Sequence, residues 1–388
     1  MQNIRNPISQ RVMKISPSGI RRFFDLVSSI EDVISLGVGE PDFVTPWHIS
    51  EAGIYAIEKG HTAYTSNYGL LELRQELSRH LKSRYSLDYD PNSELMITVG
   101  VSEALDLALR AILDPGDEVL SPEPTYVSYM PCTILTGADF VPVPTTVENE
   151  FKVQAAEIER RVSGRTKAIL LGYPNNPTGA VMDRAGLEQI AEIAQRHDLM
   201  VISDEIYDRL VYGVEHTCFA SLPEMKERTI YLGGFSKSYA MTGWRVGYAA
   251  APAEFIEAML KIHQYTMLCA PVMGQMAALE ALREGEDAVK EMVMEYDRRR
   301  RVIVKGLNEI GLACFEPKGA FYAFPSIKPY GLSSDEFTER LLVEQRVLAV
   351  PGSTFGECGE GHIRCCYAVS LPAIEEALER MRRFLRTL

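Results

Sequence analysis

The chain has 388 residues, of which 46% are hydrophobic and 24% are charged, and its formal net charge is -13. This length allows two domains whose hydrophobic cores are large enough to be stable without disulfide bonds. The negative balance argues against nucleic acid or an anionic membrane as a partner, and no run of residues is long and apolar enough to span a bilayer.

The N-terminal stretch is basic, because the first acidic residue is Asp25. Its composition overlaps with that of an organelle transit peptide. Residues 15–23 nevertheless run directly into an apolar, helix-like pattern, so we expect this stretch to belong to the folded protein. The seven cysteines include no Cys-x-x-Cys pair, and their odd number favours a reducing compartment. We therefore expect a cytoplasmic location.

Short β-branched runs alternate with helical patterns in the middle of the chain. The expected strands are Leu95–Val99, Glu118–Leu120, Lys167–Leu171, Met200–Ser203, Thr229–Leu232 and Arg245–Ala250, and the expected helices include Ser102–Leu113 and Arg184–Arg196. This alternation predicts an α/β fold with a mostly parallel sheet covered by helices on both faces. In such sheets, ligands bind at the carboxyl ends of the strands.

The pattern changes after about residue 270. One long charged helix, from Met273 to about Leu307, is followed by strands at Ala320–Phe324 and His362–Val369 and by a terminal helix from Leu371. This order predicts a second, smaller α+β domain, which the segment before Trp47 joins by crossing back. We expect residues 46–275 to form the large domain, and residues 1–45 and 276–388 to form the small one.

Lys237 and Arg245 are the most informative residues of the chain. Lys237 follows the Thr229–Leu232 run and two glycines, so it should stand at the carboxyl end of a buried strand, among small, hydroxyl and aromatic residues. A lysine amine near a second cation in a dry pocket becomes a nucleophile toward a carbonyl group. A guanidinium can hold a phosphate. The pair suits a phosphorylated aldehyde cofactor; the alternative is two solvated loop charges.

Other polar residues follow the neighbouring strands. Val101 and Ser102 open a helix after a strand and a glycine, where free backbone amides suit a phosphate, although Ser102 could simply cap the helix. Tyr126 could stack on a flat ring or fill the core. Asn176 lies in a proline-rich turn and offers an amide to a ligand, or serves the turn alone.

Two further charged residues need partners. Asp204 ends an apolar strand, where a buried carboxylate requires a cation or a metal. Arg364 lies in a late strand and could bind a carboxylate with both ends of its guanidinium, or form a surface salt bridge. A magnesium-dependent nucleotide hydrolase is a rival interpretation, but the chain lacks Gly-x-x-x-x-Gly-Lys-Ser/Thr. Gly37–Gly39 also lacks the third glycine of a dinucleotide-binding loop.

Taken together, these motifs resemble the class I/II aminotransferases, which are fold type I enzymes dependent on pyridoxal 5′-phosphate (PLP). The matching segments run in order along nearly the whole chain: 39–43, 176–179, 204–207, 236–238, 243–247, 319–322 and Arg364. The resemblance is strongest to the bacterial and archaeal subgroup with aspartate, aromatic or broad specificity. It implies ping-pong transfer of an amino group from an L-amino acid to a 2-oxo acid, in a homodimer with shared active sites.

The resemblance also implies individual roles. Lys237 would condense with the cofactor aldehyde and later move the substrate proton, while Asp204 would pair with the pyridine nitrogen. The other cofactor-binding residues would be Tyr207 and Asn176 at the phenolate oxygen, Tyr126 on the ring face, Ser236, Arg245, Val101 and Ser102 at the phosphate, and Tyr64 from the neighbouring subunit. The substrate carboxylate would be bound by Arg364 with Gly39 and Asn176. No metal is implied.

Several questions stay open from the sequence. The same cofactor would also support β-elimination on a sulfur amino acid, and a cofactor-binding regulatory module is a third hypothesis that the acidic balance and the lack of a helix-turn-helix domain disfavour. We expect Arg110 to be a solvated charge and Cys365–Cys366 to be strand residues. The sequence does not place Tyr68, Tyr129 or Tyr265 in the pocket.

Overall fold

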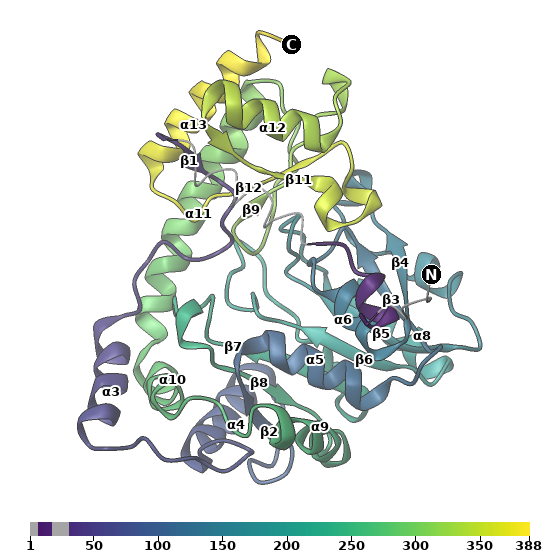
Figure 1. Ribbon diagram of the computed structural model, residues 1–388, viewed down its shortest axis with the longest axis vertical. Coiled ribbons are helices and arrows are strands. Elements are labelled where there is room, and N and C mark those ends of the chain that lie inside the picture. Colours follow the sequence, from purple (N-terminus) through teal and green to yellow (C-terminus); the bar gives the residue numbers. More distant parts are fainter. Residues whose placement is uncertain (1–6, 18–30) are drawn as a thin grey trace, which may run out of the picture.

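The computed structural model describes residues 7–17 and 31–388, and the expected pattern over residues 15–23 lies mostly outside them. A seven-stranded sheet forms the centre of the larger unit (Figure 1). Its strands, in spatial order, are β2 (Leu95–Thr98), β8 (Gly247–Ala250), β7 (Thr229–Gly234), β6 (Met200–Asp204), β5 (Thr166–Gly172), β3 (Glu118–Glu123) and β4 (Asp139–Pro144). β8 runs antiparallel to β2 and β7, and the other neighbouring pairs are parallel, so the prediction of a mostly parallel sheet is confirmed.

Three strand predictions for this sheet were wrong in their bounds by two residues or more, and one of them, Thr229–Leu232, continues to Gly234. The strand expected over Arg245–Ala250 begins at Gly247, because Arg245 follows a short 3-10 helix and has a left-handed φ of 55°. The strand expected over Glu118–Leu120 continues to Glu123. The sequence analysis also missed β4, whose residues are less buried than those of the central strands.

Helices cover both faces of this sheet. One face carries α5 (Gly100–Ile112), α6 (Tyr129–Thr136) and α9 (Ala253–Thr266). The opposite face carries α3 (Trp47–Glu58), α4 (Leu71–Tyr85), α7 (Ala155–Glu159), α8 (Arg184–Arg196) and α10 (Val272–Glu284). Successive strand residues alternate between the two layers: Ile230 and Leu232 pack toward α5, whereas Tyr231 packs toward α4 and α10. Within the described ranges, no helix is both long and apolar enough to cross a membrane.

The long helix expected from Met273 to Leu307 is two helices. α10 ends at Glu284 and α11 (Glu286–Glu309) starts after Gly285. A Cβ on Gly285 would lie 2.8 Å from the Tyr239 ring and 2.5 Å from the Ala281 carbonyl oxygen, so the close approach of Tyr239 requires glycine at the break. Periodicity alone could not reveal this tertiary contact.

The smaller unit packs two short sheets against helices. Its elements are β1 (Ile34–Ser35), β9 (Tyr322–Ala323), β10 (Val347–Leu348), β11 (Val350–Pro351), β12 (Ile363–Cys366), α12 (Ser334–Gln345) and α13 (Leu371–Leu385). β1 pairs in parallel with β10, so residues 34 and 35 lie beside a strand from the C-terminal part of the chain. β9 and β12 are shorter than expected. Cys365 and Cys366 are buried strand residues, as predicted.

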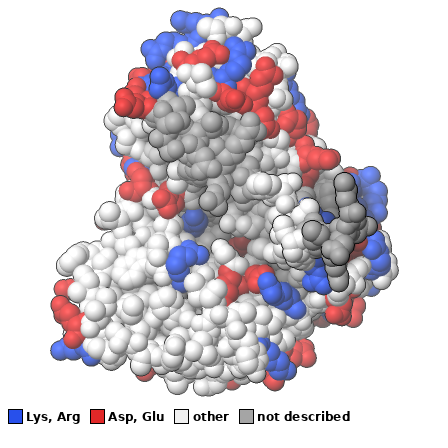
Figure 2. Space-filling model, viewed as in Figure 1, with Lys and Arg blue, Asp and Glu red and all other residues white. Residues whose placement is uncertain are grey.

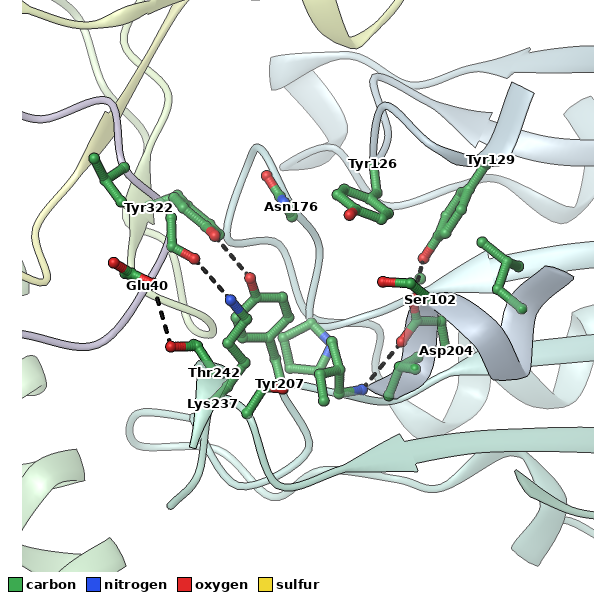
Figure 3. A pocket seen from close by; sticks show the side chains of 18 of the residues that line it. Glu40, Ser102, Tyr126, Tyr129, Asn176, Asp204, Tyr207, Lys237, Thr242 and Tyr322 are labelled. Carbon is green, nitrogen blue, oxygen red and sulfur yellow. Dashed lines mark hydrogen bonds between the residues drawn. The ribbon is translucent and has the colours of Figure 1, made fainter. Parts of the chain in front are cut away.

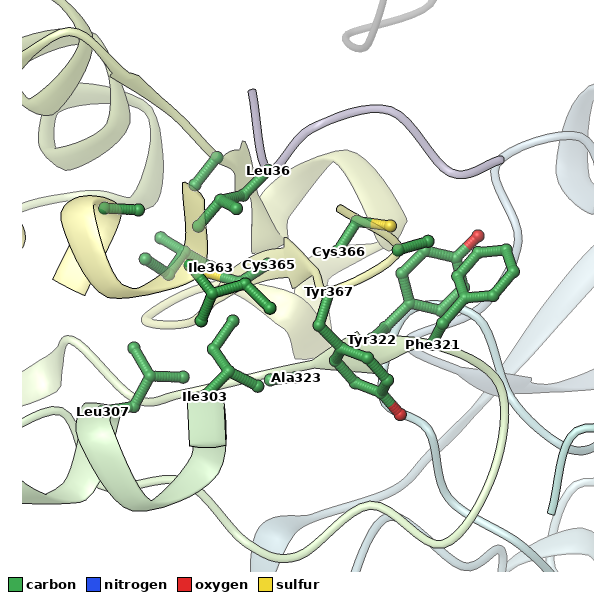
Figure 4. Packing of buried hydrophobic residues seen from close by; sticks show 14 of the residues in the cluster. Leu36, Ile303, Leu307, Phe321, Tyr322, Ala323, Ile363, Cys365, Cys366 and Tyr367 are labelled. Carbon is green, nitrogen blue, oxygen red and sulfur yellow. The ribbon is translucent and has the colours of Figure 1, made fainter. Parts of the chain in front are cut away.

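One continuous core holds the smaller unit together. Figure 4 shows Ile303 and Leu307 of α11 facing Leu36 and the β9 and β12 strands. α11 begins beside α10 at the large sheet and runs to α13, so it links the two units (Figure 1). The remaining described helix, α1 (Gln10–Met13), lies on α6, where the Arg11 guanidinium donates to the Leu135 carbonyl.

The segment from Leu36 to Phe43 leaves this core and enters the space between the units. The Leu36 amide donates to Leu348, and the Leu36 carbonyl accepts from the Cys366 amide at 2.7 Å. Farther along, Asp42 forms an ion pair with Arg299 of α11 at 2.7 Å. Both ends of the segment are therefore fixed to the smaller unit.

We expect Ile303→Ala to lower the free energy of unfolding by about 2–5 kcal/mol, because the substitution leaves a cavity in this core. Ile303 is 0% exposed, whereas Val343 is 61% exposed. Val343→Ala is therefore the control and should change stability by less than about 0.5 kcal/mol. Guanidinium titration at one fixed protein concentration measures both. Equal effects of the two substitutions would contradict the assigned core.

Candidate active site

A cavity of about 510 Å³ lies at the carboxyl ends of β5, β6 and β7 and beside the N-terminus of α5 (Figure 3). The smaller unit contributes the segment from Gly37 to Glu40, together with Tyr322 and Arg364. Most residues singled out from the sequence line this one cavity: Gly39, Val101, Ser102, Tyr126, Asn176, Asp204, Tyr207, Ser236, Lys237, Arg245 and Arg364. Tyr64 does not; it lies elsewhere and is 83% exposed.

Lys237 follows β7 and projects into the cavity. Its Nζ donates to the Gly39 carbonyl oxygen at 2.7 Å. Burial is the main cause that lowers the pKa of Lys237 to about 8, and Arg364 and Arg245 lower it further. The sequence predicted both causes, a dry pocket and a second cation, and burial is the larger of the two. A neutral, nucleophilic amine is therefore available near pH 8.

Asp204 ends β6 within the cavity wall. Its Oδ2 accepts a hydrogen bond from the Tyr129 hydroxyl at 2.8 Å, and its Oδ1 accepts one from the Ile206 amide at 3.2 Å. Burial raises the pKa of Asp204 to about 6, while the bond from Tyr129 opposes this rise. The carboxyl group is thus suited to pair with a protonated ring nitrogen, which would hold it ionised.

Asn176 and Arg364 meet on the side of the cavity that faces the smaller unit. Arg364 donates from Nη1 to Asn176 Oδ1 at 3.0 Å and from Nη2 to the Gly37 carbonyl at 2.6 Å. Its Nε is buried and has no protein partner in the described part of the chain. The guanidinium also lies over the Tyr322 ring, 4.6 Å from its centroid. A buried donor without an acceptor costs free energy unless a ligand supplies one, so this group suits an incoming carboxylate.

Tyr207 and Tyr322 close the cavity beside Lys237. Their hydroxyl oxygens are 2.7 Å apart, and burial raises the pKa of both phenols. Tyr126 lies on the opposite wall, edge-on to Tyr129 with ring centroids 5.6 Å apart (Figure 3). Aromatic rings therefore line the cavity on both of these walls.

The first turn of α5 and Arg245 meet at one corner of the cavity. The N-cap of α5 is Val99, and no side chain caps its free amides. Ser102 lies inside the first turn, so the alternative in which it caps the helix is wrong. Arg245 approaches so closely that a Cβ on Gly100 would lie 2.5 Å from its Nη2. Similarly, a Cβ on Gly247 would lie 2.6 Å from the Val101 amide nitrogen.

Four residues with polar side chains line the cavity but received no role from the sequence: Glu40, Tyr129, Thr242 and Tyr322. Tyr322 was within a quoted motif but received no role. The Glu40 carboxylate accepts a hydrogen bond from the Thr242 hydroxyl at 3.2 Å. Arg110, in contrast, pairs with Asp106 at the surface, as predicted.

The donor set fits PLP. The free amides of Val101 and Ser102 with Arg245 match a phosphate, and the low-pKa amine of Lys237 matches an aldehyde. Asp204 is the acid that a pyridinium nitrogen requires. The unpartnered Nε of Arg364 leaves a place for a substrate carboxylate.

Comparisons with known proteins agree with this geometry. A family model described as aminotransferase class I and II matches residues 31–381. The YugH protein of Bacillus subtilis is 55% identical, over 97% of this chain and 98% of its own length. An aspartate aminotransferase of Pyrococcus abyssi is 48% identical, over 98% of each chain. The crystal structure of an aromatic aminotransferase from Pyrococcus horikoshii is 47% identical, with a TM-score of 0.90, over 95% of this chain and 99% of that one.

Tyr129→Phe should raise the pKa of Asp204 above its present value of about 6, because the lost hydrogen bond favours the ionised carboxylate. The carboxyl group would then stay protonated to higher pH. Carbon-13 NMR of labelled aspartate carboxyl groups in the cofactor-free protein, assigned with Asp204→Asn, measures the shift. Tyr126→Phe is the control, because no hydrogen bond joins the Tyr126 hydroxyl to Asp204 in the structure. A superimposable titration of Tyr129→Phe and wild type would refute the assigned contact.

Proposed function

The chain belongs to the class I and II aminotransferases and is a PLP-dependent enzyme, and on this basis we propose its substrates, its residue roles and its assembly. One observation supports the proposed roles most strongly: the buried amine of Lys237 lies in the same cavity as Asp204, Arg245 and Arg364. The proposed reaction is a ping-pong transfer of the amino group from an L-amino acid to a 2-oxo acid. Two relatives are named for aspartate and for aromatic amino acids, so we propose donors from these two classes.

PLP supplies, when bound, an aldehyde and an electron-withdrawing ring. We propose that the first-turn amides of Val101 and Ser102, with Ser236 and Arg245, hold its phosphate. Ser236 lines the cavity and is 8% exposed, which supports this role. Asp204 would hold the proton on the ring nitrogen, and Tyr126 would stack on the ring.

Tyr207 and Asn176 are proposed to donate to the phenolate oxygen. The Tyr207 hydroxyl is hydrogen-bonded to the Tyr322 hydroxyl. The side-chain oxygen of Asn176 accepts from Arg364, so its amide nitrogen can donate to the ligand. Both contacts would stabilise negative charge on that oxygen.

Arg364 is proposed to bind the substrate α-carboxylate, assisted by Asn176 and the backbone at Gly39. Its unpartnered Nε supports this role. Holding the carboxylate fixes the direction of the bond from the α-carbon to its hydrogen. Lys237 Nζ would accept that proton, because a neutral amine with a pKa of about 8 is a competent base near neutral pH. β-Elimination, which the sequence left open, is not favoured by the relatives, which are named as aminotransferases.

We further propose that two copies of the chain form a homodimer. The surface around α3 and α10 shows few charges (Figure 2). It exposes large apolar side chains, among them Trp47 at 70%, Tyr55 at 51%, Ile57 at 58% and Tyr64 at 83%. Monomeric proteins rarely expose such a patch. Tyr64 would donate to the phosphate in the other subunit.

The last two proposals concern the boundary between the domains and the cellular location of the protein. We propose that the domains meet near Gly285 rather than at residue 275, because Ala277, Ala278 and Ala281 of α10 pack in the core beside α4. Residues 1–45 and the chain after α10 would then form the small domain. The seven free cysteines support a reducing, cytoplasmic location.

The experiment that tests the proposed roles is covalent labelling of Lys237. Borohydride reduction of the PLP-loaded enzyme should attach the cofactor to the peptide that contains Lys237, and Lys237→Ala should abolish this label and lower kcat at least about a hundredfold. Mass spectrometry of the peptides and stopped-flow kinetics measure the two effects. Lys261→Ala is the matched control, because Lys261 is an exposed helix residue paired with Glu257. A label on any other lysine would overturn the assignment.

The shared site predicts complementation between the impaired variant Tyr64→Ala and the inactive variant Lys237→Ala. Tyr64→Ala should weaken the binding of PLP, and Lys237→Ala should abolish turnover. When the two proteins are mixed and their subunits exchange, each hybrid dimer should contain one site with Lys237 and the partner's Tyr64 both intact, so activity should rise above that of either parent. Sedimentation velocity gives the assembly state. A hybrid that gains no activity would place Tyr64 outside the partner's site.

A further inference from the structure

The turn that leads into α5 is fastened by side chains that do not line the cavity. Val99 is the N-cap of α5, and its backbone amide donates to Glu103 Oε2 at 2.5 Å. The Thr98 hydroxyl donates to the Gly100 carbonyl at 3.0 Å and is fully buried. The backbone on both sides of Val99 is therefore held before the chain reaches the amides of Val101 and Ser102.

His263 of α9 holds Glu103 from the outside. Its Nδ1 lies 2.6 Å from Glu103 Oε1, and the imidazole is 0% exposed while the Glu103 side chain is 9% exposed. Its other ring nitrogen, Nε2, has no partner within the described residues. Within the described residues, the imidazole of His263 is therefore held by one hydrogen bond, the one to Glu103. An apolar side chain would fill the same space without the cost of burying two polar groups, so stability alone does not explain the pair.

The position of Glu103 gives the pair a consequence for anion binding. A carboxylate in the first turn of a helix interacts favourably with the helix dipole, but it also competes for the same amides as an incoming anion. Here the carboxylate is drawn back to the Val99 amide and to His263, and Glu103 does not line the cavity. The amides of Val101 and Ser102 are therefore left free to face it.

We propose that Glu103 and His263 form a positioning pair that fixes the phosphate-binding turn from the far side of α5. The inference rests on the proposed role of Val101 and Ser102 as phosphate ligands. The pair acts through the backbone and touches neither cofactor nor substrate. Its loss should weaken recognition of the phosphate group and leave recognition of the ring and the aldehyde largely intact.

Pyridoxal, which lacks the phosphate, separates this role from a general structural one. The cofactor-free, full-length protein is titrated with PLP and with pyridoxal, and the absorbance of each bound form gives the two dissociation constants. Glu103→Met and His263→Leu keep the side-chain volume but remove the acceptor or the donor. For both, the Kd of PLP should rise about tenfold, as expected when one partner of a buried hydrogen bond is lost. The Kd of pyridoxal should change less than about twofold.

Conservative variants at the same two positions should restore the affinity for PLP. Glu103→Gln retains an acceptor for the Val99 amide, and His263→Asn retains a donor near the position of Nδ1. Both should keep the Kd of PLP within about threefold of wild type, and they also serve if the apolar variants fail to fold. Phosphorus-31 NMR of bound PLP should show a displaced or broadened phosphate resonance in His263→Leu and the wild-type resonance in His263→Asn.

The outcomes are distinct. Parallel losses in the affinity for PLP and for pyridoxal would mean a structural role and would overturn the inference, as would unchanged Kd values in Glu103→Met and His263→Leu. Wild-type protein that binds neither compound at Lys237 would instead refute the proposed function itself.

Discussion

The site depends on an amine that is buried without a counter-ion. Within residues 7–17 and 31–388 no carboxylate forms an ion pair with Lys237, and its Nζ donates instead to the neutral carbonyl of Gly39 at 2.7 Å. A carboxylate partner would stabilise the ammonium form and keep the pKa high. A carbonyl satisfies the amine but stabilises its charge less, so burial prevails and the pKa falls to about 8. The lowered pKa of Lys237 thus depends on the lack of a carboxylate partner for its amine within the described residues.

That carbonyl belongs to a segment that the smaller unit controls. Gly39 lies between Leu36, which is bonded to β10 and β12, and Asp42, which pairs with Arg299 of α11. In the same segment, the Gly37 carbonyl accepts from Arg364 at 2.6 Å. One stretch of backbone therefore sets the position of the amine and of the guanidinium together. Any displacement of the smaller unit relative to the large sheet would move both groups, which connects the packing around α11 to the geometry of the reaction.

The sequence predicted those parts of the site that follow directly from a strand. Asp204 stands immediately after an apolar run, and Lys237 follows another such run after a turn at two glycines, so their place at one edge of a parallel sheet could be inferred without a structure. Tyr129 and Tyr322 could not be placed, because their partners are 75 and 115 residues away in the chain. The break at Gly285 was missed for the same reason: a ring from another element imposes it. The role of Tyr64 at the phosphate stays a prediction, because that contact requires a second copy of the chain.

The adjacent acids Asp204 and Glu205 show how the sheet separates chemically similar residues. Successive strand residues point to opposite faces, so Asp204 lines the cavity while Glu205 accepts hydrogen bonds from Ser203 and the Phe219 amide in the other layer. Burial alone would lower the pKa of His216, but Glu205, 2.6 Å away, outweighs that effect and the pKa of His216 is raised. The charge of Glu205 in turn contributes to the raised pKa of Asp204. The pKa of the Asp204 carboxyl group is therefore affected from both faces of the sheet, by the hydrogen bond from Tyr129 on one side and by the charge of Glu205 on the other.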